Sequence, residues 1–170
     1  MKATIAALLV GMIAVTTSVS THGQPANCPQ SPTDTTGWIW HDEGNFSIKL
    51  PPRFETVEAE SVDSKVGRWE SGGFFVYYDF GIYSNPLDPE KQGSFPDMTV
   101  CEQSEGISPR IVVYRDEADK SVHMGAHWPE LPLNVFHRTA LTLVGTAPDR
   151  HTRSELLAVI QSVRWNQDNE

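Results

Sequence analysis

The sequence has few cysteines, fewer basic than acidic residues, and no long hydrophobic run after its first fifteen residues. Its 170 residues include 2 cysteines, and 22 acidic residues outnumber 13 basic ones. Binding to nucleic acid or to an anionic membrane surface requires a basic patch, so we expect neither partner. No stretch beyond the N-terminus is apolar enough to predict a membrane-spanning helix. The acidic balance is typical of a soluble surface and identifies no function by itself.

The common catalytic signatures are also missing. The chain has no G-x-S-x-G nucleophile elbow, P-loop, dinucleotide-binding fingerprint or calcium-loop pattern. A secreted hydrolase with a Ser–His–Asp triad is an alternative, because the chain contains many serines and histidines. No spacing of these residues supports it. The acidic pairs Glu58 with Glu60 and Asp116 with Glu117 lie in charged, turn-like segments, which favours solvated surface over glycoside chemistry. We therefore predict a noncatalytic protein with no resident cofactor.

The chain does begin with a recognisable export signal. Lys2 precedes an apolar stretch of about 13 residues, which is too short to span a bilayer core of about 30 Å as a helix. A run of small polar residues follows. This is the layout of a secretory signal peptide over residues 1–20, with cleavage after Ser20 or, alternatively, after Gly23. We predict an exported protein, periplasmic or extracellular.

Both cysteines, Cys28 and Cys101, follow this signal. In an exported protein an even pair most simply forms a disulfide. The bond would close a loop of about 74 residues, to which the chain-entropy model assigns roughly 4 kcal/mol of stability. It would tether an irregular leader, residues 21–36, to the domain. A reactive thiol or a metal-ligand pair is the alternative, although neither a CxxC spacing nor an adjacent histidine supports it.

The hydrophobic pattern of residues 37–166 predicts one α+β domain. We expect a mostly antiparallel β-sheet of about six to eight strands with a C-terminal helix packed on it. Phe46, Ile48 and Leu50 alternate with polar residues, which indicates a half-buried strand. Segments 66–70 and 74–80 are expected to form a hairpin whose second strand is apolar on both faces and therefore central. Other expected features are strands at 98–103, 110–114, 121–127 and 138–146, a loop at 128–132, and a frayed tail at 167–170.

The C-terminal helix has a start signal of its own. Thr152 and Glu155 have the spacing of a capping box, and the apolar residues that follow recur at helical spacing. The sequence therefore predicts a helix over residues 152–162.

Two segments resemble the PsbP-type superfamily, the extrinsic photosystem II subunit and its relatives. Residues 46–54, FSIKLPPRF, are similar to the strand, prolines and aromatic residue that open those domains. The closing strand and helix, together with residues 162–165, SVRW, are similar to the end of those domains. The resemblance implies an α/β/α sandwich around an antiparallel sheet, acting as a binding scaffold without enzyme activity. No ligand motif of that superfamily matches, so no functional residue is carried over.

His123 and His127 are the sharpest candidates for a metal site. On a strand they share one face, and in a helix they lie one turn apart. At the rise of a strand their Cα atoms would be about 13 Å apart, too far for one metal ion without a bend. A metal-binding periplasmic protein is therefore an alternative function that requires a third ligand. The candidates for that ligand are His41, Asp79, Glu130 and His137.

Residues 81–97 form the longest irregular stretch after the leader. A loop of this length in a compact domain is usually functional or mobile. It follows an aromatic-rich strand and carries Tyr83, while Trp128 lies between His127 and Pro129. Exposed aromatic side chains are enriched in binding interfaces. We predict an exported binding or accessory protein that contacts a protein or small-molecule partner through this loop, Tyr83 and Trp128.

Overall fold

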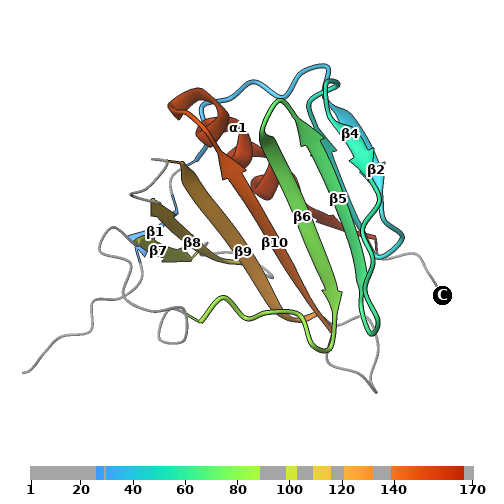
Figure 1. Ribbon diagram of the computed structural model, residues 1–170. Coiled ribbons are helices and arrows are strands. Elements are labelled where there is room, and N and C mark those ends of the chain that lie inside the picture. The colour runs from blue at the N-terminus through green and yellow to red at the C-terminus, as the bar shows by residue number, and fades with distance from the viewer. Residues whose placement is uncertain are drawn as a thin grey trace, which may run out of the picture.

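The fold is described from a computed structural model of the chain. The described residues are 26–28, 30–88, 99–102, 109–115, 121–131 and 139–166. The expected signal peptide, the acidic pair at 116–117, His137, the tail and residues 89–98 lie outside them. Within these ranges, eleven strands form two sheets, and one helix, α1 (Arg150–Gln161), covers one face of the larger sheet (Figure 1).

The larger sheet has eight strands in the order β1-β7-β8-β9-β10-β6-β5-β4. Every neighbouring pair is antiparallel except β1 and β7, which run parallel. The predicted α+β fold, mostly antiparallel with a C-terminal helix, is thereby confirmed. The strands are β1 (Ala26–Asn27), β4 (Glu55–Val57), β5 (Lys65–Ser71), β6 (Phe74–Gly81), β7 (Thr99–Glu102), β8 (Arg110–Arg115), β9 (Val122–Leu131) and β10 (Thr139–Ala147).

The smaller sheet has three strands in the order β11-β3-β2, namely β11 (Arg164–Trp165), β3 (Phe46–Leu50) and β2 (Ile39–Asp42). Phe46, Ile48 and Leu50 are fully buried, as their alternation predicts. The Phe46 ring contacts the Tyr78 ring edge-on at a centroid distance of 5.1 Å. The smaller sheet and α1 therefore share one core with the larger sheet, and we call the face of the larger sheet that they cover its inner face.

Strands β5 and β6 form the hairpin that the sequence predicts. Ser71 pairs with Phe74, so only Gly72 and Gly73 form the turn. Their φ angles are 57° and 84°, the left-handed values that the favoured two-residue hairpin turn requires. Strand β6 lies between β5 and β10 and is partly or fully buried on both faces, which confirms that it is a central strand.

The start of α1 differs from the expected capping box. The helix begins at Arg150 with Asp149 as its N-cap. The Asp149 carboxylate accepts a hydrogen bond from Thr152 N at 2.9 Å, and Thr152 Oγ1 accepts one from Asp149 N at 3.1 Å. Thr152 is therefore the third helical residue rather than the cap. Glu155 lies a further turn along, where it is buried and forms an ion pair with Arg53.

Residues 128–131 extend strand β9, where the sequence predicts a loop. Trp128 pairs with Leu141 and Leu131 pairs with Thr139, with a register irregularity between these two pairs. Pro129 lies at this irregularity. A proline is tolerated at such a bulge because its missing N–H breaks no regular ladder bond.

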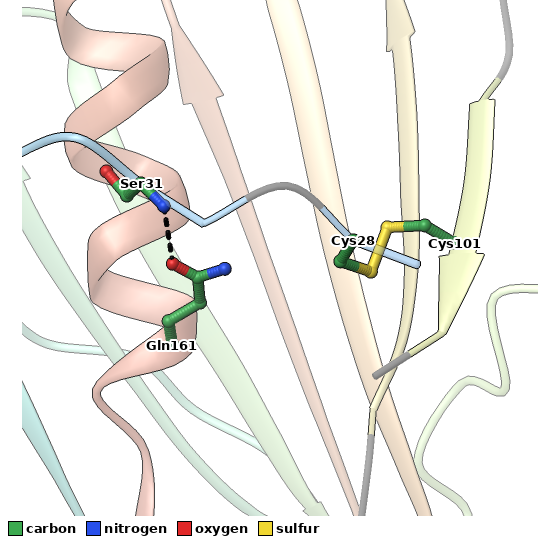
Figure 2. The surroundings of a disulfide bond; sticks show 4 residues. All are labelled: Cys28, Ser31, Cys101 and Gln161. Carbon is green, nitrogen blue, oxygen red and sulfur yellow. Dashed lines mark hydrogen bonds between the residues drawn. A yellow bond between two sulfur atoms is a disulfide. The ribbon is translucent and has the colours of Figure 1, made fainter. Parts of the chain in front are cut away.

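The leader is tied to the domain at two points. Cys28 and Cys101 form the predicted disulfide, with their Cα atoms 4.9 Å apart. Ser31 N donates to Gln161 Oε1 at 2.9 Å, which attaches the same segment to the end of α1 (Figure 2). The leader also contains strand β1, so it is not irregular throughout.

The described residues contain one helix, on one face of the larger sheet. A second helical layer, which the PsbP-type resemblance implies, is not found among the described residues.

The one helix in the described residues, α1, is neither long enough nor apolar enough to cross a membrane.

Candidate functional site

Residues 82–88 cross the outer face of the larger sheet, the face directed away from α1 (Figure 1). We call them the crossing segment. Ser84 Oγ lies 2.6 Å from Thr142 Oγ1, and Thr142 Oγ1 donates to the Asn85 carbonyl oxygen at 2.6 Å. Ser84 Oγ also donates to the Asp79 carbonyl oxygen at 3.1 Å. These bonds fix the segment against β10 and the end of β6.

Leu87 holds the crossing segment on β9. A Cβ atom added to Gly125 would lie 2.6 Å from Leu87 Cδ1, so only glycine permits this close approach. The φ angle of Leu87 is 50°, a left-handed value that is strained for a leucine. Such strain persists only where the surrounding structure imposes it. The buried Leu87 side chain and its contact with Gly125 supply that constraint.

The crossing segment leaves a hollow on each side of Leu87. The first, which we call the Tyr83 groove, has a volume of about 400 Å³ and is lined by Ile82, Tyr83, Ser84, Pro86, His127, Pro129, Thr139 and Ala140. The second, the His123 cavity, has a volume of about 240 Å³, and its lining includes Phe75, Leu87, Val112, His123, Val144 and Thr146. Each hollow therefore contains one of the two histidines of β9.

The two aromatic residues chosen from the sequence lie in different environments. Tyr83 is 69% exposed at the groove, as a contact residue must be. Trp128 is 3% exposed, and its ring lies 6.0 Å from the Trp165 ring in the core. The expectation that Trp128 is an exposed anchor is therefore wrong. Successive residues of a strand point to opposite faces, so its neighbours His127 and Pro129 line the groove instead.

His127 is hydrogen-bonded and uncharged at neutral pH. Its Nδ1 lies 2.9 Å from Thr142 Oγ1. Burial and the nearby Arg110 both lower the pKa of His127 from its ordinary value of 6.5. The Tyr83 groove therefore contains a neutral imidazole.

The structure does not place the His123 and His127 rings around a common metal site. His123 Nδ1 lies 2.9 Å from Thr146 Oγ1, and its Nε2 lies 2.9 Å from Ser121 Oγ, so both ring nitrogens face hydroxyl groups. Leu87, packed on Gly125, lies between the two histidines. Within the described ranges, no group of three or more His, Cys, Asp or Glu side chains is arranged to hold a metal ion.

The residues expected as a third metal ligand do not complete a metal site with His123 or His127 in the described part of the chain. The His41 ring packs against the Trp69 ring at 5.7 Å. Asp79 lies opposite Thr142 across the β6–β10 pair, so β10 separates it from His127. The Glu130 side chain and His137 lie outside the described part of the chain.

The pair of Ser121 and His123 bears on the hydrolase alternative. In a serine hydrolase triad, a carboxylate orients the histidine and stabilises its charged form. Here the hydroxyl of Thr146 occupies the corresponding position at Nδ1 and cannot supply that charge. Ser121 itself is buried. These three residues therefore form a hydrogen-bonded chain in which a hydroxyl group, and not a carboxylate, faces Nδ1 of the histidine.

Comparison with known proteins adds little to this geometry. No family model matches the chain, and no curated protein matches its sequence. Among solved structures, it is similar to a crystal structure from Bacteroides thetaiotaomicron VPI-5482 at 1.50 Å resolution, with a TM-score of 0.39 and 11% identity. The match covers 74% of this chain and 46% of that chain, so this chain spans less than half of that protein's length. A likeness this weak carries no argument about function. The resemblance to the PsbP-type superfamily stays a prediction.

Proposed function

We propose that the protein is an exported, noncatalytic binding protein that holds a small uncharged ligand in the Tyr83 groove. The observation that carries this proposal is the position of two exposed apolar side chains, Ile82 at 55% and Tyr83 at 69%, at the edge of a hollow of about 400 Å³. Small-molecule sites typically have volumes of roughly 300–1,000 Å³, with mostly apolar walls and a few polar groups.

The lining of the groove favours an uncharged ligand. None of its eight residues is an aspartate, glutamate, lysine or arginine, and His127 is neutral at pH 7. Ile82, Tyr83, Pro86 and Pro129 supply apolar surface, and the hydroxyl groups and imidazole of the remaining polar residues supply hydrogen bonds. We therefore infer a ligand with an aromatic or aliphatic ring and one hydrogen-bonding group.

The groove is largely preformed. The Ser84, Thr142 and Asn85 hydrogen bonds and the contact of Leu87 with Gly125 hold its wall in place before any ligand arrives. Binding to a preorganised site avoids the entropy cost of ordering a loop. This rigidity supports a binding role for the crossing segment.

Export is supported by two features. The N-terminal residues have the pattern of a secretory signal. The disulfide between Cys28 and Cys101 is a bond that persists in oxidising compartments and is rare in reducing ones.

The experiment is a fluorescence titration with Nile red, an uncharged apolar dye, on the chain with its disulfide intact. We expect saturable binding that Tyr83→Ala weakens by about five- to tenfold, because one aromatic contact is removed. Val62→Ala is the matched control, since Val62 is 103% exposed and does not line the groove, and it should bind like the wild type. Equal binding by Tyr83→Ala, or no saturable binding at all, would refute the proposal.

A further inference from the structure

A separate hollow lies on the opposite side of the fold, against the outward face of the smaller sheet. We call it the Trp40 pocket. Its volume is about 260 Å³, and three parts of the chain form it: the leader, the smaller sheet and the end of α1. Its lining includes Ser31, Thr33, Thr35, Trp40, Lys49 and Arg164.

Strand register brings two cations to one aromatic ring in this pocket. Trp40 pairs directly with Lys49, and Arg164 pairs with Ser47, which is on the same face of β3 as Lys49. The Lys49 ammonium lies 5.3 Å from the centroid of the Trp40 ring, and the Arg164 guanidinium carbon lies 4.5 Å from it. Both distances are within the range of a cation–π interaction.

Neither cation has an ion-pair partner within the part of the chain that the structure describes. Other basic residues do: Arg53 pairs with Glu155, Lys65 with Glu43, and Arg68 with Glu70. The chain carries 22 acidic and 13 basic residues, so acidic partners are not scarce. Two like charges placed together repel each other, and an anion bound between them would relieve this repulsion.

Two acidic residues on this side of the fold, Asp34 and Asp42, accept hydrogen bonds from groups other than the two cations. Asp34 Oδ1 accepts a hydrogen bond from Thr36 N at 2.8 Å, and hydrogen bonds from Thr36, more than the charge of Lys49, lower the pKa of Asp34. Asp42 Oδ1 accepts hydrogen bonds from Gly44 N at 2.8 Å and from Asn166 Nδ2 at 2.9 Å.

Polar groups at the end of α1 form hydrogen bonds within the helix and with the leader. Ser162 caps the Val159 carbonyl oxygen with its N–H at 3.1 Å and its hydroxyl at 2.7 Å. The hydrogen bond from Ser31 N to Gln161 Oε1 holds the leader over this end of the helix and so keeps the pocket wall in place (Figure 2). Thr33 and Thr35 add hydroxyl groups, which can donate to an anion.

We propose that the Trp40 pocket binds a small oxyanion of the phosphate or sulfate type between Lys49 and Arg164. A delocalised guanidinium and an ammonium are the cations that proteins use for such groups. The inference goes beyond the proposed function. It uses no residue of the Tyr83 groove, so either proposal can fail without the other.

Isothermal titration calorimetry with inorganic phosphate and, separately, inorganic sulfate tests the proposal, with sodium chloride added to keep the ionic strength constant. We expect millimolar affinity for at least one of the two anions. Combining Lys49→Gln with Arg164→Gln should weaken binding by about tenfold or more, because both charge-assisted contacts are removed. Lys65→Gln is the control, since Lys65 is ion-paired with Glu43 and lies outside the pocket, and it should bind like the wild type.

The phosphate and sulfate titrations identify which oxyanion the site prefers, and binding of either one supports the site. Unchanged affinity in the double variant, or no binding of either anion beyond the chloride background, would overturn the proposal. A second readout does not depend on the folding of a variant. In the wild-type protein, phosphate or sulfate should shift the indole N–H resonance of Trp40 in a ¹H–¹⁵N spectrum, and an unshifted resonance at saturation would contradict the site.

Discussion

Leu87 lies directly over Gly125, with its Cδ1 atom 2.6 Å from the position that a Cβ on Gly125 would take. Gly125 separates His123 from His127 on the outer face of β9, so the leucine side chain lies between the two histidines. One contact therefore fixes the crossing segment and separates the Tyr83 groove from the His123 cavity.

Gly125→Ala should lower the free energy of unfolding by about 1–3 kcal/mol, because the added methyl group overpacks the contact with Leu87. The loss should be smaller in a Leu87→Ala background, where the space is open. Urea unfolding of the wild type, both single variants and the double variant measures this coupling. Purely additive losses would contradict the contact.

Trp128→Ala should destabilise the protein by about 3–5 kcal/mol, as expected for removal of a large buried side chain. Tyr83→Ala, at an exposed position, should change the free energy of unfolding by no more than about 0.5 kcal/mol. Chemical denaturation of the two variants gives both values. A small effect of Trp128→Ala would show that the tryptophan is not part of the core.

The stability of the protein should fall as the pH drops below about 6.5, in part through His127. Burial lowers the pKa of His127 in the folded state, so the unfolded chain binds the proton more readily. The contribution of the neutral imidazole is therefore complete above the unfolded pKa and is lost as the pH falls through the folded one. Urea unfolding between about pH 7.5 and pH 5 should show a shallower decline for His127→Gln than for the wild type. A steeper decline for the variant would contradict a lowered pKa.

Breaking the disulfide should destabilise the protein by up to about 4 kcal/mol, because the unfolded chain regains the freedom of a long loop. The two hydrogen bonds of Ser31, from its N–H to Gln161 Oε1 and from its hydroxyl to the Ser154 carbonyl oxygen, would then still hold this part of the leader to α1. Thermal unfolding with and without dithiothreitol measures the loss. The variant with alanine at both Cys28 and Cys101 should not respond to the reductant. A wild-type protein that is equally stable when reduced would show that the tether contributes nothing.

Much of the fold could be predicted because its signals are local. The alternation of Phe46, Ile48 and Leu50 predicts β3, and the glycines at 72 and 73 predict the hairpin turn. The disulfide followed from the number of cysteines and the export signal.

The candidate sites could be predicted only in part, because long-range pairing assembles them. Tyr83 was identifiable as an aromatic residue in a long loop. The extension of β9 through Pro129 depends on a bulge against β10, and this extension decides that His127, and not Trp128, faces the groove. The Trp40 pocket depends on the pairing of Arg164 with Ser47, more than a hundred residues away in the sequence, and no local motif marks it.

The central claim is that the Tyr83 groove is the ligand site, and chemical-shift mapping with phenol tests it most directly. Phenol is uncharged at neutral pH and combines an aromatic ring with one hydroxyl group. On titration into the ¹⁵N-labelled protein, the largest amide shifts should fall at Ile82, Tyr83, Ser84, His127 and Thr139, which line the groove. Shifts centred instead on His123 and Thr146 would place the site in the His123 cavity, and an absence of saturable shifts at the groove would equally contradict the account.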